Sequence, residues 1–201
     1  MERIDAFPTQ LWIEVTDNID NDALAEFILN KQKTDGNVNL ENLRSGSSGS
    51  WQSHTQLFDD LVKEIPDTIS GLDNLIKKTV KEIILYNEYK YDVKINYKGM
   101  WANINGYKDY NKPHVHPQCD WSGVYYVKIP ENCGSICFVD PRTVRHMLTQ
   151  PYLYGNKQAT QLVIVPAVGR LIMFPSFLEH QVDSNQSHEP RISISFNLGL
   201  F

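Results

Sequence analysis

Two histidines, His114 and His116, stand one residue apart in the stretch NKPHVHPQCDWSGVYYV at residues 111–127. In an extended chain, residues i and i+2 point to the same face, so this spacing aims two imidazoles at one point, as a metal site requires. Pro113 and Pro117 favour an extended backbone for the residues that precede them. The pair therefore predicts either two metal ligands or two histidines that are solvent-exposed or hydrogen-bonded.

A further histidine, His180, lies in the stretch GRLIMFPSFLEHQV at residues 169–182. The run from Leu171 to Phe174 has the alternating, buried character of a strand, and Pro175 ends it. A short extended piece then carries His180. A single histidine at the end of a strand is usually structural, so His180 becomes a metal ligand only if the fold brings it to the first pair.

The C-terminal stretch EPRISISFNLGLF, residues 189–201, alternates strictly between apolar and polar side chains. The polar face predicts either contact with water or the lining of a cavity. In a cavity, an arginine with a hydroxyl two residues further on can bind a carboxylate, because the guanidinium fork matches two oxygens and serine adds a donor. The apolar face holds Ile192, Ile194, Phe196 and Leu198, and the polar face holds Arg191, Ser193, Ser195 and Asn197.

The secondary structure predicted to position these residues changes from helices to strands near residue 91. Before it, the pattern predicts a short strand at 10–16, helices within 18–33, 53–65 and 67–89, and a long loop at 34–50. After it, period-2 alternation predicts strands at 92–98, 100–105, 122–129, 134–139, 160–165, 169–174 and 190–198. Residues 143–160 are expected to form a lid or substrate loop.

This order predicts a mainly β fold with N-terminal helices, in which the short strands form a sandwich or barrel. The 201 residues fit a single domain, with residues 1–90 as mostly helical support and residues 91–201 as the core that carries the site.

Composition narrows the class of protein. A formal net charge of −5 argues against a nucleic-acid partner, because phosphate binding needs a basic surface. No apolar run reaches the roughly 20 residues that span a bilayer, and no secretory signal precedes the first strand. The odd number of cysteines, three, predicts reduced thiols. We therefore expect a cytoplasmic protein without a membrane partner, in the host cytoplasm if a phage encodes it.

Taken in order, the motifs H-x-H-P, SGVYYV, GRLIMFPSFLEH and RISISFN resemble the Fe(II)/2-oxoglutarate-dependent oxygenase superfamily, over roughly residues 100–199. More narrowly, they resemble its small bacterial and phage branch. The resemblance implies a double-stranded β-helix, or jelly-roll, core braced by N-terminal helices. It also implies Fe(II) and 2-oxoglutarate as cofactors, and a dioxygenase that hydroxylates a substrate the sequence does not identify.

The resemblance also assigns residues. His114 matches the first metal histidine, His180 the distal one, and Arg191 the residue that binds the remote carboxylate of 2-oxoglutarate. Ser193 completes an R-x-S pair, and no catalytic residue is assigned beyond the metal site. Tyr126 matches a position where a tyrosine often reaches the cosubstrate. Trp101 and Asn103, on the strand before the metal motif, would line the same mouth, and Asn103 is grouped with the cofactor-binding residues.

The third metal ligand departs from the superfamily pattern. The superfamily places an acid where this chain has His116. Either His116 completes an all-histidine site, or Asp120 supplies the carboxylate. A neutral third ligand would leave the iron with one more positive charge.

Two further hypotheses stay open. The chain could be a cupin-like three-histidine metalloenzyme that uses no 2-oxoglutarate, or a non-catalytic jelly-roll accessory protein. The remaining histidines are predicted to be surface residues, and the two arginines near the predicted mouth either receive an anionic substrate or pair with surface acids. These residues are His54, His146 and His188, with Arg142 and Arg145.

Overall fold

The computed structural model describes residues 2, 7–35, 50–89, 93–142 and 160–201. Apart from their end residues, the predicted loop over 34–50 and the predicted lid over 143–160 lie outside this part, as do Arg145 and His146.

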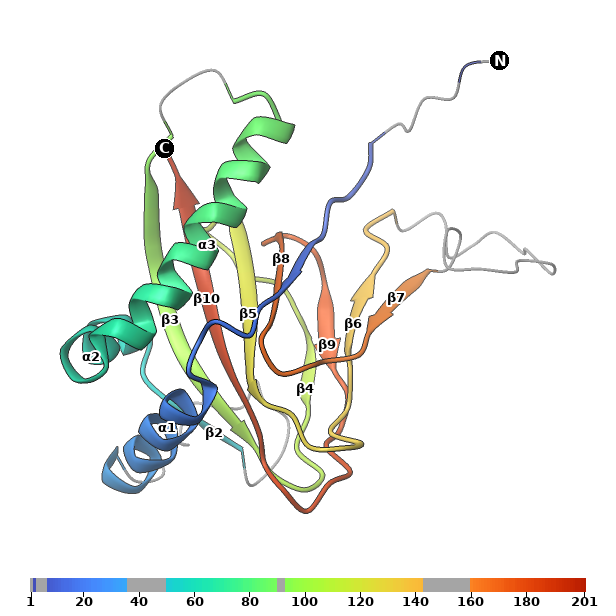
Figure 1. Cartoon of the computed structure of the whole chain (residues 1–201). Coiled ribbons are helices and arrows are strands. Elements are labelled where there is room, and N and C mark those ends of the chain that lie inside the picture. Colours follow the sequence, from blue (N-terminus) through green and yellow to red (C-terminus); the bar gives the residue numbers. More distant parts are fainter. Residues whose placement is uncertain (1, 3–6, 36–49, 90–92, 143–159) are drawn as a thin grey trace.

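Two antiparallel sheets face each other across the interior (Figure 1). The larger sheet has six strands in the order β1-β8-β5-β10-β3-β2, and the smaller has four in the order β4-β9-β6-β7. The larger sheet comprises β1 (Trp12–Val15), β2 (Trp51–Gln52), β3 (Ile95–Asn105), β5 (Trp121–Lys128), β8 (Arg170–Pro175) and β10 (Arg191–Leu200). The smaller comprises β4 (Asn111–His114), β6 (Ile136–Val139), β7 (Gln161–Ile164) and β9 (His180–Val182).

Helices α1 (Asn21–Asp35), α2 (Leu57–Glu64) and α3 (Pro66–Tyr86) cover the face of the larger sheet that points away from the smaller one (Figure 1). Pro66 starts α3, where its missing N–H removes no helical hydrogen bond. The helices precede the strands of the core, as the sequence predicts. None of the helices in the described ranges is both long and apolar enough to cross a membrane.

Alternation along the strands gives the larger sheet two different buried faces. Toward the helices, Tyr125 of β5 joins the apolar side chains of β10 in one core with all three helices. Toward the smaller sheet, Val124 and Tyr126 join a second cluster with Phe138 and Phe174. The site therefore lies between the sheets, where the second set of side chains points.

One sequence prediction needs correction. The predicted strands at 92–98 and 100–105 form one strand, β3, because β10 pairs with it on both sides of Gly99. The strand predicted at 10–16 is confirmed as β1, and β1 and β2 form the two edges of the six-stranded sheet.

Candidate metal centre

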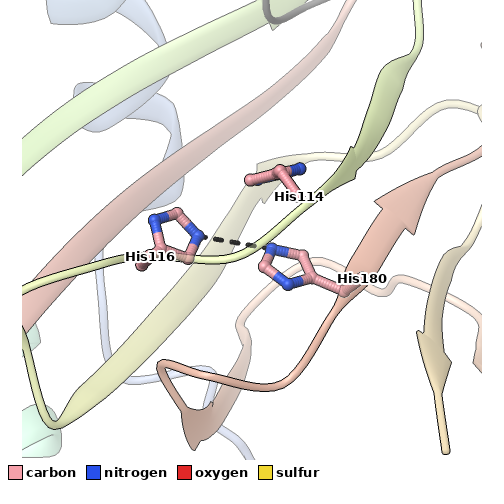
Figure 2. A group of neighbouring side chains, drawn as sticks. All are labelled: His114, His116 and His180. Carbon is pink, nitrogen blue, oxygen red and sulfur yellow. Dashed lines mark hydrogen bonds between the residues drawn. The ribbon is translucent and has the colours of Figure 1, made fainter. Parts of the chain in front are cut away.

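Three histidines from two segments meet between the sheets (Figure 2). His114 ends β4, His180 begins β9, and the antiparallel pairing of these strands places the two residues directly opposite each other. His116 follows β4 by two residues, so its ring returns to the same side. One nitrogen from each imidazole lies within 4.8 Å of the others, a spacing that one metal ion can bridge.

Backbone carbonyls fix which ring nitrogen of two histidines carries the proton. Nδ1 of His114 lies 2.7 Å from the carbonyl oxygen of Lys112, and Nδ1 of His180 lies 2.9 Å from that of Leu178. Because a carbonyl oxygen can only accept, each Nδ1 is the donor, and each Nε2 keeps its lone pair. This is the arrangement in which outer hydrogen bonds orient metal-binding histidines.

The distance between ligand atoms also suits a metal. Nε2 of His116 and Nε2 of His180 lie 3.3 Å apart. Two nitrogens bound at right angles to one ion at ordinary metal–nitrogen lengths lie about 3 Å apart. Burial, together with the nearby His114, lowers the pKa of His180 to about 3, so its imidazole is neutral and able to coordinate.

A cavity of about 400 Å³ opens beside the histidines, and it collects the side chains that the sequence singled out. Its lining comes from β2, β3, β5, β8 and β10 of the larger sheet and from β4, β6 and β9 of the smaller one. Among the lining residues are the three histidines, Arg191, Ser193, Tyr126, Asn103 and Trp101. The polar face of β10 therefore lines a cavity and does not face bulk water.

Arg191 lies at the closed end of this cavity with 2% of its surface exposed. Its Nη1 donates to the carbonyl oxygens of Cys133 and Asp183, which holds the side chain in place. Its Nη2 is buried and has no hydrogen-bond partner among the described residues. Burial lowers the pKa of the guanidinium, because a desolvated cation is unfavourable. A carboxylate in the cavity would satisfy Nη2 and offset that cost.

The other predicted cosubstrate residues form a row across the sheet next to Arg191. Ser193 of β10 pairs with Asn103 of β3 on one side and with Tyr126 of β5 on the other. Tyr126 is 2% exposed, and burial raises the pKa of its hydroxyl, so the hydroxyl stays protonated and can donate. Side chains arranged in this way could together bind one small anionic ligand.

Asp120, the alternative third ligand, is engaged elsewhere. Its Oδ2 accepts a hydrogen bond of 2.7 Å from the backbone N–H of Leu200, near the end of β10. It is neither among the grouped ligand atoms nor among the described residues that line the cavity. Geometry therefore favours His116 over Asp120 as the third ligand.

The weaker candidates lie outside the cavity. Arg142 is paired with Asp140 on the surface, His54 lies 3.1 Å from Asp60, and His188 stacks on Tyr107. Sequence reasoning did not select four other lining residues: Gln52, Thr55, Asn105 and Asn111. No local signal marks Gln52, which reaches the cavity only because β2 pairs with β3.

The fold is shared with solved structures of low sequence identity. A Pseudomonas putida prolyl-4-hydroxylase matches with a TM-score of 0.58 and 13% identity, over 95% of this chain and 92% of that one. A Trichoplax adhaerens prolyl hydroxylase, in complex with a hypoxia inducible factor peptide, matches at 0.64 and 12%, over 94% and 83%. A viral collagen prolyl hydroxylase from Paramecium Bursaria Chlorella virus-1 matches at 0.57 and 16%, over 94% of each chain. These matches confirm the predicted jelly-roll core.

The similarity to a known family lies in the sequence of the strand-rich half of the chain. No curated protein matches the chain significantly. Residues 99–197 match the family described as "Putative 2OG-Fe(II) oxygenase", and this segment holds the three histidines and the cavity-lining face of β10. Through this segment, just under half of its length, the chain is similar to this family of oxygenases, which use Fe(II) and 2-oxoglutarate.

Proposed function

We propose that this protein is an Fe(II)/2-oxoglutarate-dependent hydroxylase whose metal is held by His114, His116 and His180. Arg191 and Ser193 would bind the far carboxylate of 2-oxoglutarate, with Tyr126 and Asn103 beside it. The observation that carries the proposal is the buried, unpartnered Nη2 of Arg191 in the same cavity as three clustered imidazoles. A three-histidine enzyme without 2-oxoglutarate would leave that group unexplained.

Bound Fe(II) and 2-oxoglutarate would activate O2, so that one oxygen atom enters a C–H bond of the substrate as a hydroxyl and the other enters the cosubstrate, which loses CO2 and becomes succinate. The protein supplies position and exclusion of water. Lys112 and Leu178 orient the imidazoles of His114 and His180 through their carbonyl oxygens. The guanidinium of Arg191, anchored by the backbone of Cys133, orients the cosubstrate along the cavity.

The binding half of the proposal can be tested without a substrate. Under anaerobic conditions, Fe(II) and 2-oxoglutarate together should produce a visible charge-transfer band, and elemental analysis should find one metal per chain. We expect His116→Ala to weaken metal binding by more than about 100-fold, because even outer-shell changes cost about 10–100-fold.

Asp120→Asn is the matched variant for the third ligand. Its amide oxygen can still accept from the N–H of Leu200, so the fold should persist, and metal binding and the band should remain. If Asp120→Asn abolished metal binding while His116→Ala retained it, the assignment of the third ligand would be reversed. Bound metal without the band would count against 2-oxoglutarate as the cosubstrate.

We infer a cytoplasmic location for this activity. Cys119, Cys133 and Cys137 are all free thiols, as is usual in reducing compartments. The net charge of −5 further supports a substrate other than nucleic acid.

A further inference from the structure

The cavity has two ends that differ in exposure. Arg191 and Tyr126, each 2% exposed, close one end. Exposed residues, Thr55 and Pro117, line the other end, where the cavity meets the surface. If 2-oxoglutarate occupies the closed end, as proposed above, the substrate must enter through the open one. The chemistry of the open end therefore indicates what the substrate is.

Charge is confined to the closed end. Among the described residues that line the cavity there is no aspartate, glutamate or lysine, and Arg191 is the one arginine. The open end offers amides, hydroxyls and the indole of Trp101, whose ring centroid lies 5.9 Å from that of His116. A charged group that entered this end would lose water without gaining a counter-ion from the described side chains, which is unfavourable. A neutral group would not incur this cost of losing water without a counter-ion.

Two polar side chains of β10 are held ready to donate hydrogen bonds. Ser122 lies beneath Asn197 and donates to its Oδ1 at 2.8 Å, which leaves the Nδ2 hydrogens of Asn197 for the cavity. Nδ2 of Asn103 donates to Oγ of Ser195 at 3.0 Å, so the hydroxyl hydrogen of Ser195 is also free to donate. Both donors are uncharged and oriented before any ligand binds.

The spacing of these donors suits a particular acceptor. Ser195 and Asn197 are two residues apart on one face of a strand, so their backbones lie about 6.5–7 Å apart. Carbonyl oxygens on the same side of an extended peptide repeat at the same interval, about 6.5–7 Å. A sheet that presents neutral donors at this interval is complementary to an extended, uncharged peptide backbone.

We propose that the substrate is an uncharged peptide segment, bound in extended form at the open end, whose carbonyl oxygens accept hydrogen bonds from Ser195 and Asn197. Trp101 provides an apolar surface beside the metal. The proposal rests on the proposed function, because it assigns the closed end to 2-oxoglutarate.

Three probes of similar size and shape but different charge test whether the open end prefers a neutral ligand. N-acetyl-dialanine N-methylamide, which is capped by an amide at both ends and is therefore called the diamide below, is neutral. N-acetyl-dialanine is an anion, and dialanine N-methylamide is a cation. Binding is measured by saturation-transfer NMR on protein loaded with Zn(II) and N-oxalylglycine, an inert analogue of 2-oxoglutarate. We expect the neutral diamide to bind at least about tenfold more tightly than either ion. A charged probe that binds as well as the diamide, or a diamide that does not bind, would overturn the proposal.

Variants of the two donors test the assigned contacts. Asn197→Asp preserves the shape and the bond from Ser122, but removes the donor and adds a negative charge, so preference should shift from the diamide to the cation. Ser195→Ala should weaken diamide binding several-fold without changing the charge preference. Asn30→Asp, on the exposed face of α1, is the control and should change nothing. Diamide affinity that is unaffected by both cavity variants would contradict the proposal.

Two further measurements distinguish failure of the proposed function from failure of the peptide proposal. Calorimetry first measures loading with Zn(II) and N-oxalylglycine, so failure to load counts against the proposed function. Normal loading without diamide binding counts against the peptide substrate alone. Methyl glucoside serves as a neutral probe without amides, and preference for it over the diamide would replace a peptide with a carbohydrate.

Discussion

Strand β10 separates two interiors that exclude water to a similar degree but have opposite compositions. On the helix side, Ile192, Ile194, Phe196 and Leu198 are all 0% exposed. On the cavity side, Arg191 and Ser193 are 2% and 6% exposed. Burial alone therefore does not distinguish the layer that stabilises the fold from the layer that forms the site.

The difference lies in what each buried face gains. The apolar face is stabilised by its removal from water and by close packing against three helices. The protein itself therefore supplies the contacts of this face. The polar face carries a guanidinium nitrogen that forms no hydrogen bond within the described part of the chain. An unsatisfied buried donor is unfavourable for stability, so its presence points to a ligand.

The largest expected effect comes from the apolar face. Ile194→Ala should lower the free energy of unfolding by about 2–5 kcal/mol, because it removes buried methyl groups from a packed core. Chemical denaturation measures this loss. The affinity of the folded fraction for metal and 2-oxoglutarate should not change.

Its neighbour Ser193→Ala is the matched change on the polar face. Its stability should stay within about 0.5 kcal/mol of the native protein, while 2-oxoglutarate binds more weakly. If Ser193→Ala and Ile194→Ala lowered the free energy of unfolding equally, β10 would not divide into one face that stabilises the fold and one that forms the site.

A smaller effect, on binding and not on folding, is expected from Arg191→Lys. Lysine retains the charge but not the planar fork, so 2-oxoglutarate should bind about 10–100-fold more weakly, as expected for the loss of one charged hydrogen bond. Calorimetry on metal-loaded protein measures the change. Arg142→Lys is the control, since Arg142 pairs with Asp140 on the surface and should not affect binding. Unchanged affinity in Arg191→Lys would remove this residue from the cosubstrate site.

The smallest effects are expected from substitutions of Tyr125 and Tyr126, two adjacent residues whose side chains point to opposite faces of the larger sheet. The hydroxyl of Tyr125 donates to Oδ1 of Asn21 on α1 at 3.0 Å, so Tyr125→Phe should lower the free energy of unfolding by about 1 kcal/mol. It should not change the affinity for 2-oxoglutarate. Thermal denaturation and calorimetry measure the two quantities.

Tyr126→Phe should behave in the opposite way. The structure records no hydrogen bond from the Tyr126 hydroxyl to a described residue, and the side chain lines the cavity. Stability should be unchanged, and the affinity for 2-oxoglutarate should fall a few-fold. A stability loss equal to that of Tyr125→Phe would show that the hydroxyl serves the fold and not the ligand.

Local patterns determined much of this protein before its structure was known. Period-2 alternation in β10 separated Arg191 and Ser193 from the isoleucines, and the spacing of His114 and His116 placed two imidazoles on one side. The change from helical to alternating periodicity near residue 91 predicted the order of helices and strands. These features depend on residues a few positions apart, so they can be read from the chain.

Only the tertiary structure decided how distant segments meet. The pairing of β4 with β9 places His114 opposite His180, and nothing near either residue specifies that register. Gln52 enters the cavity through β2, and Asp120 is drawn away from the histidines by the N–H of Leu200. Such contacts depend on which strands become neighbours, and that choice is made by packing over the whole chain rather than by local sequence.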